Sequence, residues 1–251
     1  MRDAWKWVVG AVVAVAVLVP AGTWIYINVI EGDPPAKLTL DSAGSGQPVG
    51  TTTTVAAATS NSTAATTATT PTTAAATPAG ALTYKPGASS IVGYRVNEVL
   101  FGQKNEAVGR TNKITGSMTL DGVQVSAVDL IVDMKSVSSD NSQRDGQFQG
   151  RIMATSIYPT ATFKLTQPLV LSNVPADSTV VNAKATGDLT LHGVTKSVTF
   201  DLAAQRDGAN IKVNGTIPVV FADYKIANPS AGPATTEDHG VLEFLVVFEK
   251  A

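Results

Sequence analysis

The sequence contains no cysteine among its 251 residues. Disulfide bonds, thiolate zinc sites and cysteine nucleophiles are therefore excluded, and so is lipid attachment at a processed N-terminal cysteine. There is no basic surplus either, because 18 basic and 20 acidic residues nearly cancel, and nucleic-acid binding needs excess positive charge to neutralise phosphates. Aromatic residues make up only 6% of the chain, and the only histidines are His192 and His239.

Charge is absent from one long apolar run, Val8–Ile30. As a helix, this run spans about 34 Å, which is enough to cross the hydrocarbon core of a bilayer. Two basic residues precede the run and two acidic residues follow it closely, so the positive-inside rule places residues 1–7 in the cytoplasm as a short tail. We expect a single-pass protein of the cell membrane, with 8–30 as a signal anchor and the rest extracytoplasmic.

A cleaved signal peptide is the alternative interpretation of this run. Its apolar region would be Val8–Val19, with cleavage after the sequence Val19-Pro20-Ala21. Both interpretations export the remainder of the chain.

Residues 31–83 are predicted to be a disordered extracytoplasmic linker. Between Thr51 and Gly80, 23 of 30 residues are Thr or Ala, with two prolines and no charge. Such a tract has too little bulky apolar surface to offset the entropy lost on ordering. It is typical of a stalk, either O-glycosylated or an unmodified spacer.

Residues 84–251 are long enough to form one core and read as an all-β domain. Apolar and polar residues alternate with a period of two, as in the run Ala127–Met134. Tight-turn signals such as Asp121-Gly122 join successive runs. Eight strands are predicted, near Ile91–Leu100, Lys113–Leu120, Val123–Met134, Ala161–Thr166, Thr179–Leu191, Ser197–Gln205, Ile211–Val220 and Gly240–Glu249.

The segment Ser138–Pro159 does not alternate and is predicted to form short helical turns that cap one end. About eight antiparallel strands commonly close into a barrel, which removes exposed sheet edges and can leave room for a small ligand. Alternation alone does not distinguish such a cavity from a filled core.

Five stretches of this domain match one family in its usual order. They are "SIVGYRVNE", "AVGRTNKITGSMTLDG", the pair Arg144-Asp145, "YPTATFKL" and "GDLTLHGVTKSVTFDL". The domain resembles the YceI-like family of exported, lipocalin-like barrels that bind polyisoprenoids or other lipids. The resemblance implies a lipocalin-like barrel around a long apolar ligand. The membrane anchor and the Thr/Ala-rich tract depart from the family's usual signal-peptide arrangement.

On this basis we predict a non-enzymatic lipid-binding protein of the cell envelope, serving storage, transport or stress response. A structural or interaction barrel without a ligand cavity is the alternative, and a homodimer is left open. No cofactor, metal or catalytic residue is predicted. The predicted apolar lining comprises Val128, Leu130, Val132, Met134, Phe148, Met153, Phe163, Leu165, Leu189 and Leu191.

Four polar residues are further site candidates. Arg144 and Asp145 either fix the cap segment or form a polar mouth that contacts a ligand head group. His192 lies in a predicted hairpin bend without an acidic neighbour, so we expect a local hydrogen bond. His239 follows Glu237 and Asp238, but adjacent side chains rarely converge on one metal ion, so we expect a solvated loop.

Overall fold

The computed structural model describes residues 34–42, 80–171, 177–232 and 234–251. The predicted anchor, 8–30, and most of the predicted linker lie outside these residues. Within the described ranges, no helix is long and apolar enough to cross a membrane.

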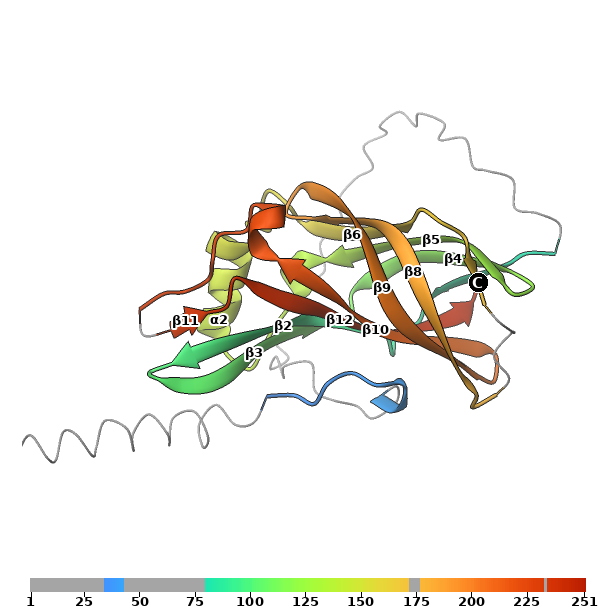
Figure 1. Cartoon of the computed structure of the whole chain (residues 1–251), viewed down its shortest axis with the longest axis horizontal. Coiled ribbons are helices and arrows are strands. Elements are labelled where there is room, and N and C mark those ends of the chain that lie inside the picture. Colours follow the sequence, from blue (N-terminus) through green and yellow to red (C-terminus); the bar gives the residue numbers. More distant parts are fainter. Residues whose placement is uncertain (1–33, 43–79, 172–176, 233) are drawn as a thin grey trace, which may run out of the picture.

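Antiparallel strands dominate the described chain, as predicted (Figure 1). The strands are β1 (Leu82–Pro86), β2 (Ile91–Leu100), β3 (Gln103–Thr111), β4 (Ile114–Asp121), β5 (Gln124–Asp133), β6 (Thr160–Leu165), β7 (Leu169–Val170), β8 (Val180–Leu191), β9 (Val194–Asp207), β10 (Asn210–Val220), β11 (Ala234–Thr236) and β12 (His239–Lys250). The helical elements are η2 (Leu40–Ser42), η3 (Met134–Ser136), α2 (Ser142–Gln147), η4 (Phe148–Ile152) and η5 (Phe221–Tyr224).

The wall closes as an eight-stranded ring in the order β1-β4-β5-β6-β8-β9-β10-β12, because β1 pairs with both β4 and β12. The closing contact is short and joins Tyr84–Pro86 to Phe248–Lys250. Toward the other end of β12, the strand β2 pairs with the same edge of β12 that β1 uses, and Arg95 lies opposite Val241. The predicted antiparallel barrel is confirmed, and closure leaves no long unpaired edge along β12.

The eight predicted strands correspond to β2, β4, β5, β6, β8, β9, β10 and β12. The sequence prediction missed β1, β3, β7 and β11. Because β1 begins at Leu82, the barrel starts two residues before the predicted boundary at Tyr84. The non-alternating segment forms α2 and η4, which together confirm the predicted helical cap at one end of the barrel (Figure 1).

A nine-residue segment far from the barrel in sequence lies on its outer face. This segment, Pro34–Ser42, is called the strap here and falls within the predicted linker (blue in Figure 1). The Arg95 Nη2 donates to the Pro35 carbonyl at 2.8 Å, and the Asn214 Nδ2 donates to the Leu38 carbonyl at 2.9 Å. The Leu38 side chain is buried. The predicted linker therefore includes a stretch that packs on the folded domain.

Beneath the strap lies a buried group of charges on the outside of the wall. Glu243 is only 3% exposed and pairs with Arg110 at 2.7 Å and with Arg95 at 3.3 Å. The strands place Gly93 between Glu243 and Arg110. A Cβ atom at Gly93 would lie 2.9 Å from the Arg110 Cγ, so the absent side chain leaves room for Arg110 to reach the carboxylate. Arg95 also pairs with Glu106, and Arg110 donates to the Ala36 carbonyl.

This group yields a stability prediction. Glu243→Gln removes the charge that two buried guanidinium groups share, and losing one partner of a buried ion pair costs about 3–5 kcal/mol. Urea unfolding of residues 34–251 should show a loss of this size. As a control, Asp201→Asn breaks the exposed Lys184–Asp201 pair, which joins side chains 61% and 82% exposed, and should cost under about 1 kcal/mol. Equal losses of unfolding free energy in the two variants would contradict the conclusion that Glu243 is a buried, paired charge.

Candidate ligand cavity

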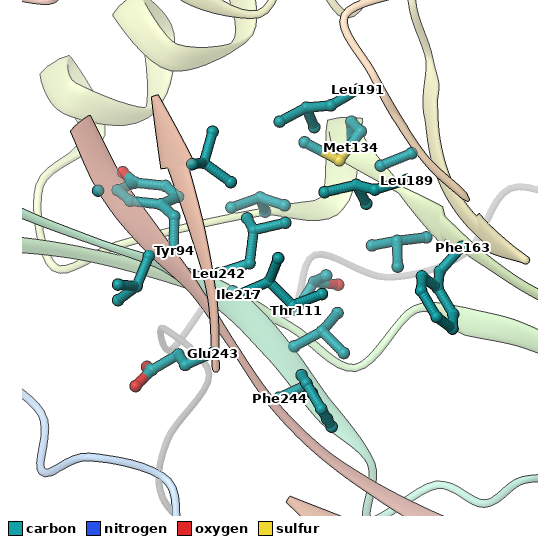
Figure 2. Close-up of a pocket in the computed structure, with 18 of the residues that line it drawn as sticks. Tyr94, Thr111, Met134, Phe163, Leu189, Leu191, Ile217, Leu242, Glu243 and Phe244 are labelled. Carbon is teal, nitrogen blue, oxygen red and sulfur yellow. The ribbon is translucent and has the colours of Figure 1, made fainter. Parts of the chain in front are cut away.

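The barrel encloses a cavity of about 940 Å³. Its lining is mainly apolar and comes from seven of the eight strands of the ring, all except β1. Figure 2 shows part of this lining. This volume is at the upper end of the range for small-molecule sites in proteins, about 300–1,000 Å³. Water in such a space finds few polar partners, so an apolar occupant is favoured over water.

All ten residues of the predicted apolar lining border this cavity. Val128, Leu130 and Val132 alternate along β5 with outward-facing residues such as Ile131, which is 40% exposed. Phe163 on β6 stands between Leu130 of β5 and Leu189 of β8 in the register. The placement of these side chains agrees with the prediction, and their role in binding stays a prediction.

Three phenylalanine rings form an edge-to-face row inside the barrel. The Phe200 ring lies 5.5 Å from that of Phe163 and 5.7 Å from that of Phe244. Glycines on neighbouring strands make room for two of these rings, because a Cβ atom at Gly187 would lie 2.5 Å from Phe163 and one at Gly215 would lie 2.7 Å from Phe244. The absence of side chains at these two glycines therefore gives Phe163 and Phe244 space beside the neighbouring strands.

The capped end of the cavity carries most of its polar lining. Glu98, Asn141, Gln143, Arg144 and Gln147 border the cavity there. Phe148 and Met153 of the cap are buried, and the Phe148 ring stacks on Tyr94 at 5.0 Å. Both residues border the cavity from the cap segment, and their role in closing the mouth stays a prediction.

Tyr94 is a half-buried polar side chain that borders the cavity at this end. Burial raises the pKa of its hydroxyl well above the ordinary value, the positive charge of Arg144 opposes the shift, and Asp145, Glu98 and Asp140 reinforce it. The hydroxyl therefore remains protonated at neutral pH and is available as a hydrogen-bond donor. The sequence prediction did not name Tyr94, although the alternation of Val92, Tyr94 and Val96 would have placed it inward.

Arg144 and Asp145 have separate roles. Arg144 borders the cavity, pairs with Asp140 four residues earlier in the chain and lies 3.6 Å from Glu98. The Asp145 carboxylate instead accepts hydrogen bonds from the backbone N–H and the hydroxyl of Ser139, at 2.8 and 2.7 Å. Asp145 is not among the cavity-lining residues. The position of Asp145 agrees with the alternative in which it fixes the cap segment. The position of Arg144 is compatible with both alternatives, fixing the cap and contacting a ligand head group.

The two histidines lie apart from this cavity. His192 is in the tight turn between β8 and β9, where its Nδ1 lies 3.1 Å from the Tyr224 carbonyl oxygen and its ring meets Tyr158 edge to face. His239 is exposed, with Nδ1 2.8 Å from Asp238, and the hydrogen bond with Asp238 raises its pKa. Within the described residues, no group of three or more His, Cys, Asp or Glu side chains could hold a metal ion.

Comparison with known proteins agrees with this geometry. The sequence model of one protein family, described as the YceI-like domain, matches residues 82–248, which are about two thirds of the chain. The chain belongs to the YceI-like family.

The relatives of this YceI-like chain include UPF0312 proteins of two bacteria. One from Vibrio parahaemolyticus is 30% identical over 149 residues, which cover 56% of this chain and 74% of the relative. One from Pseudomonas aeruginosa is 32% identical over 162 residues, covering 61% and 78%. Among solved structures, a polyisoprenoid binding domain from Saccharophagus degradans superposes with a TM-score of 0.54 at 17% identity, covering 68% of this chain and 99% of that domain. At this identity, the superposition supports the fold alone.

The turn that holds His192 yields a second prediction. His192 and Gly193 have φ values of +50° and +73°, and a Cβ atom at Gly193 would lie 2.5 Å from the Tyr158 ring. Gly193→Ala should therefore cost backbone strain of about 1–2 kcal/mol plus the displacement of Tyr158. Gly208→Ala is the matched control, since Gly208 has φ +59° in another hairpin and nothing lies within 4 Å of its Cβ position. If both variants melted at the same temperature, the close approach of Tyr158 to Gly193 would make no difference to the stability of the fold.

Proposed function

We propose that this protein is a membrane-tethered, extracytoplasmic, non-enzymatic binding protein for one long apolar ligand, an isoprenoid or another lipid. It would serve storage, transport or stress response in the cell envelope. The observation that carries the proposal is the apolar cavity of about 940 Å³ inside a YceI-like barrel. The polyisoprenoid binding domain with the same fold supports the ligand class.

The energetics of burial favour a long chain over a compact polar molecule. Each buried methylene contributes about 0.8 kcal/mol, so ten of them contribute about 8 kcal/mol before the costs of binding. The cavity wall supplies apolar contacts from β5, β6, β8, β10 and β12, whereas its polar groups gather at the capped end. This arrangement suits an amphiphile whose polar end lies near Tyr94 and Arg144.

Export and anchoring rest on the sequence. The apolar run Val8–Ile30 and its flanking charges support a retained helix with the barrel outside the cytoplasm. Single-pass attachment would keep the binding domain close to the lipid phase that supplies an isoprenoid ligand.

A matched pair of substitutions on β5 tests the ligand proposal. Leu130 borders the cavity, whereas its neighbour Ile131 faces outward and is 40% exposed. Leu130→Asp places a charge in the apolar interior, where an unpaired carboxylate is strongly disfavoured, and should abolish binding of a fluorescent polyprenyl probe to delipidated residues 34–251. Ile131→Asp adds the same charge to the outer surface and should leave the affinity within a few-fold of the original.

Circular dichroism and thermal melting establish that both variants are folded before titration. The proposal fails if the folded parent protein binds no probe. It also fails if Leu130→Asp and Ile131→Asp bind equally well, because the probe would then occupy a site outside the barrel.

A further inference from the structure

The strap fixes where the chain enters the folded domain. Its carbonyl groups accept hydrogen bonds from Arg95, Arg110 and Asn214, and Leu38 is 7% exposed against the wall. The described chain resumes at Gly80, close to the start of β1. The Thr/Ala-rich tract lies in the segment between Ser42 and Gly80, and both of these residues adjoin segments of the folded domain. Because the tract connects two parts of the same domain, it does not set the distance between the barrel and residue 30.

The distance between the barrel and residue 30 is set instead by the few residues between the apolar run and the strap. From Ile30 to Pro34 the chain advances four residues, which reach at most about 14 Å when fully extended. A free linker from residue 31 to β1 would have a root-mean-square length of about 40 Å. If 8–30 spans the membrane as predicted, the docked strap therefore keeps Pro34 near the bilayer surface.

The direction of the strap selects which end of the barrel is near Pro34. In the strand register, Arg95, which binds Pro35, lies opposite Val241 of β12, and Asn214, which binds Leu38, lies opposite Leu245. The strap therefore runs along β12 in the same direction as that strand, with its N-terminal end toward the β2–β3 hairpin. Figure 1 shows the strap on the same side of the barrel as β2 and β3.

An exposed aromatic residue occupies this hairpin. Phe101 lies in the turn between β2 and β3, is 56% exposed and also borders the cavity. Val99 on the same hairpin is 39% exposed. The opposite end of the barrel also exposes apolar residues, namely Val123 at 39% and Val170 at 67%. Exposed apolar surface alone therefore does not indicate which end of the barrel lies near the membrane, whereas the direction of the strap does.

We propose that the strap holds the β2–β3 end of the barrel against the outer surface of the bilayer that the anchor spans. Phe101 then buries its apolar ring at the lipid interface, as Trp, Phe and Leu do on membrane-surface segments, and the cavity lies next to the membrane. An apolar ligand passes between bilayer and cavity at this end, which spares it a path through water. This inference rests on the proposed function: the orientation of the barrel rests on the proposed membrane anchor, and the ligand transfer rests on the proposed ligand.

Membrane proximity can be measured site by site, because the chain has no cysteine and one introduced thiol takes one label. Gln103→Cys places a fluorophore on the β2–β3 hairpin, and Gln124→Cys places it at the start of β5, at the opposite end. The full chain is reconstituted in vesicles whose lipids carry a nitroxide quencher at the head group. We expect quenching of the label at position 103 and none at 124, unchanged when residues 51–70 are deleted or duplicated.

Two strap variants provide the controls. Leu38→Asp, and replacement of 34–42 by a Gly/Ser segment of equal length, should abolish the quenching at 103 or make it depend on the length of the tract. Thermal melting of each variant shows whether the barrel stays folded. If Leu38→Asp unfolds the barrel, the deletion and duplication arms still test the proposal with the strap intact.

Three results would overturn the proposal. They are equal quenching at 103 and 124, quenching at 103 that changes with tract length while the strap is intact, and a protein that does not float with the vesicles. Probe binding to residues 34–251 in solution tests the ligand part of the proposed function and does not depend on any of these results.

Discussion

The pairing of one edge of β12 with two different strands is the constraint on which the rest of the structure depends. β1 takes one end of its edge and β2 takes the other, so a single strand both closes the ring and carries the β2–β3 extension. Along β12, Leu242, Phe244 and Val246 line the cavity, whereas Leu245 and Val247 are buried on the outer side. This strand is therefore covered on both faces, which is unusual for an antiparallel barrel with a solvated exterior.

Burial on both faces explains why the charges and the strap occur together. Glu243 faces outward at a position covered by neighbouring chain, where an unpaired carboxylate would be costly. Arg95 and Arg110 neutralise it, and carbonyl groups of the strap accept hydrogen bonds from the same guanidinium groups. The strap thus contributes hydrogen-bond acceptors to a wall that would otherwise leave these N–H groups to solvent. On the inner side, the glycines beside Phe163 and Phe244 give these rings space beside the neighbouring strands.

Local alternation was enough to predict most of this fold and most of the apolar lining. Val128, Leu130 and Val132 could be placed inward because β5 alternates regularly over Val128–Val132, and the resemblance to the YceI-like family supplied the expectation of a cavity. β3 was missed because it begins with Gln, Lys, Asn and Glu, and because Ala107–Thr111 is buried on both faces, so no alternation appears. The strap was assigned to a linker, since its docking depends on Arg95, Arg110 and Asn214, which lie far away in the sequence. Such non-local contacts have no periodic signal.

Native mass spectrometry of the full chain, purified from the membranes in which it is made, tests the central claim most directly. A long apolar ligand in the cavity predicts a population heavier than the bare polypeptide by one defined lipid mass, which organic extraction removes and which the Leu130→Asp variant lacks. A folded protein that is found only at its bare mass, or that carries the same adduct after Leu130→Asp, would contradict the claim that the barrel interior holds a lipid.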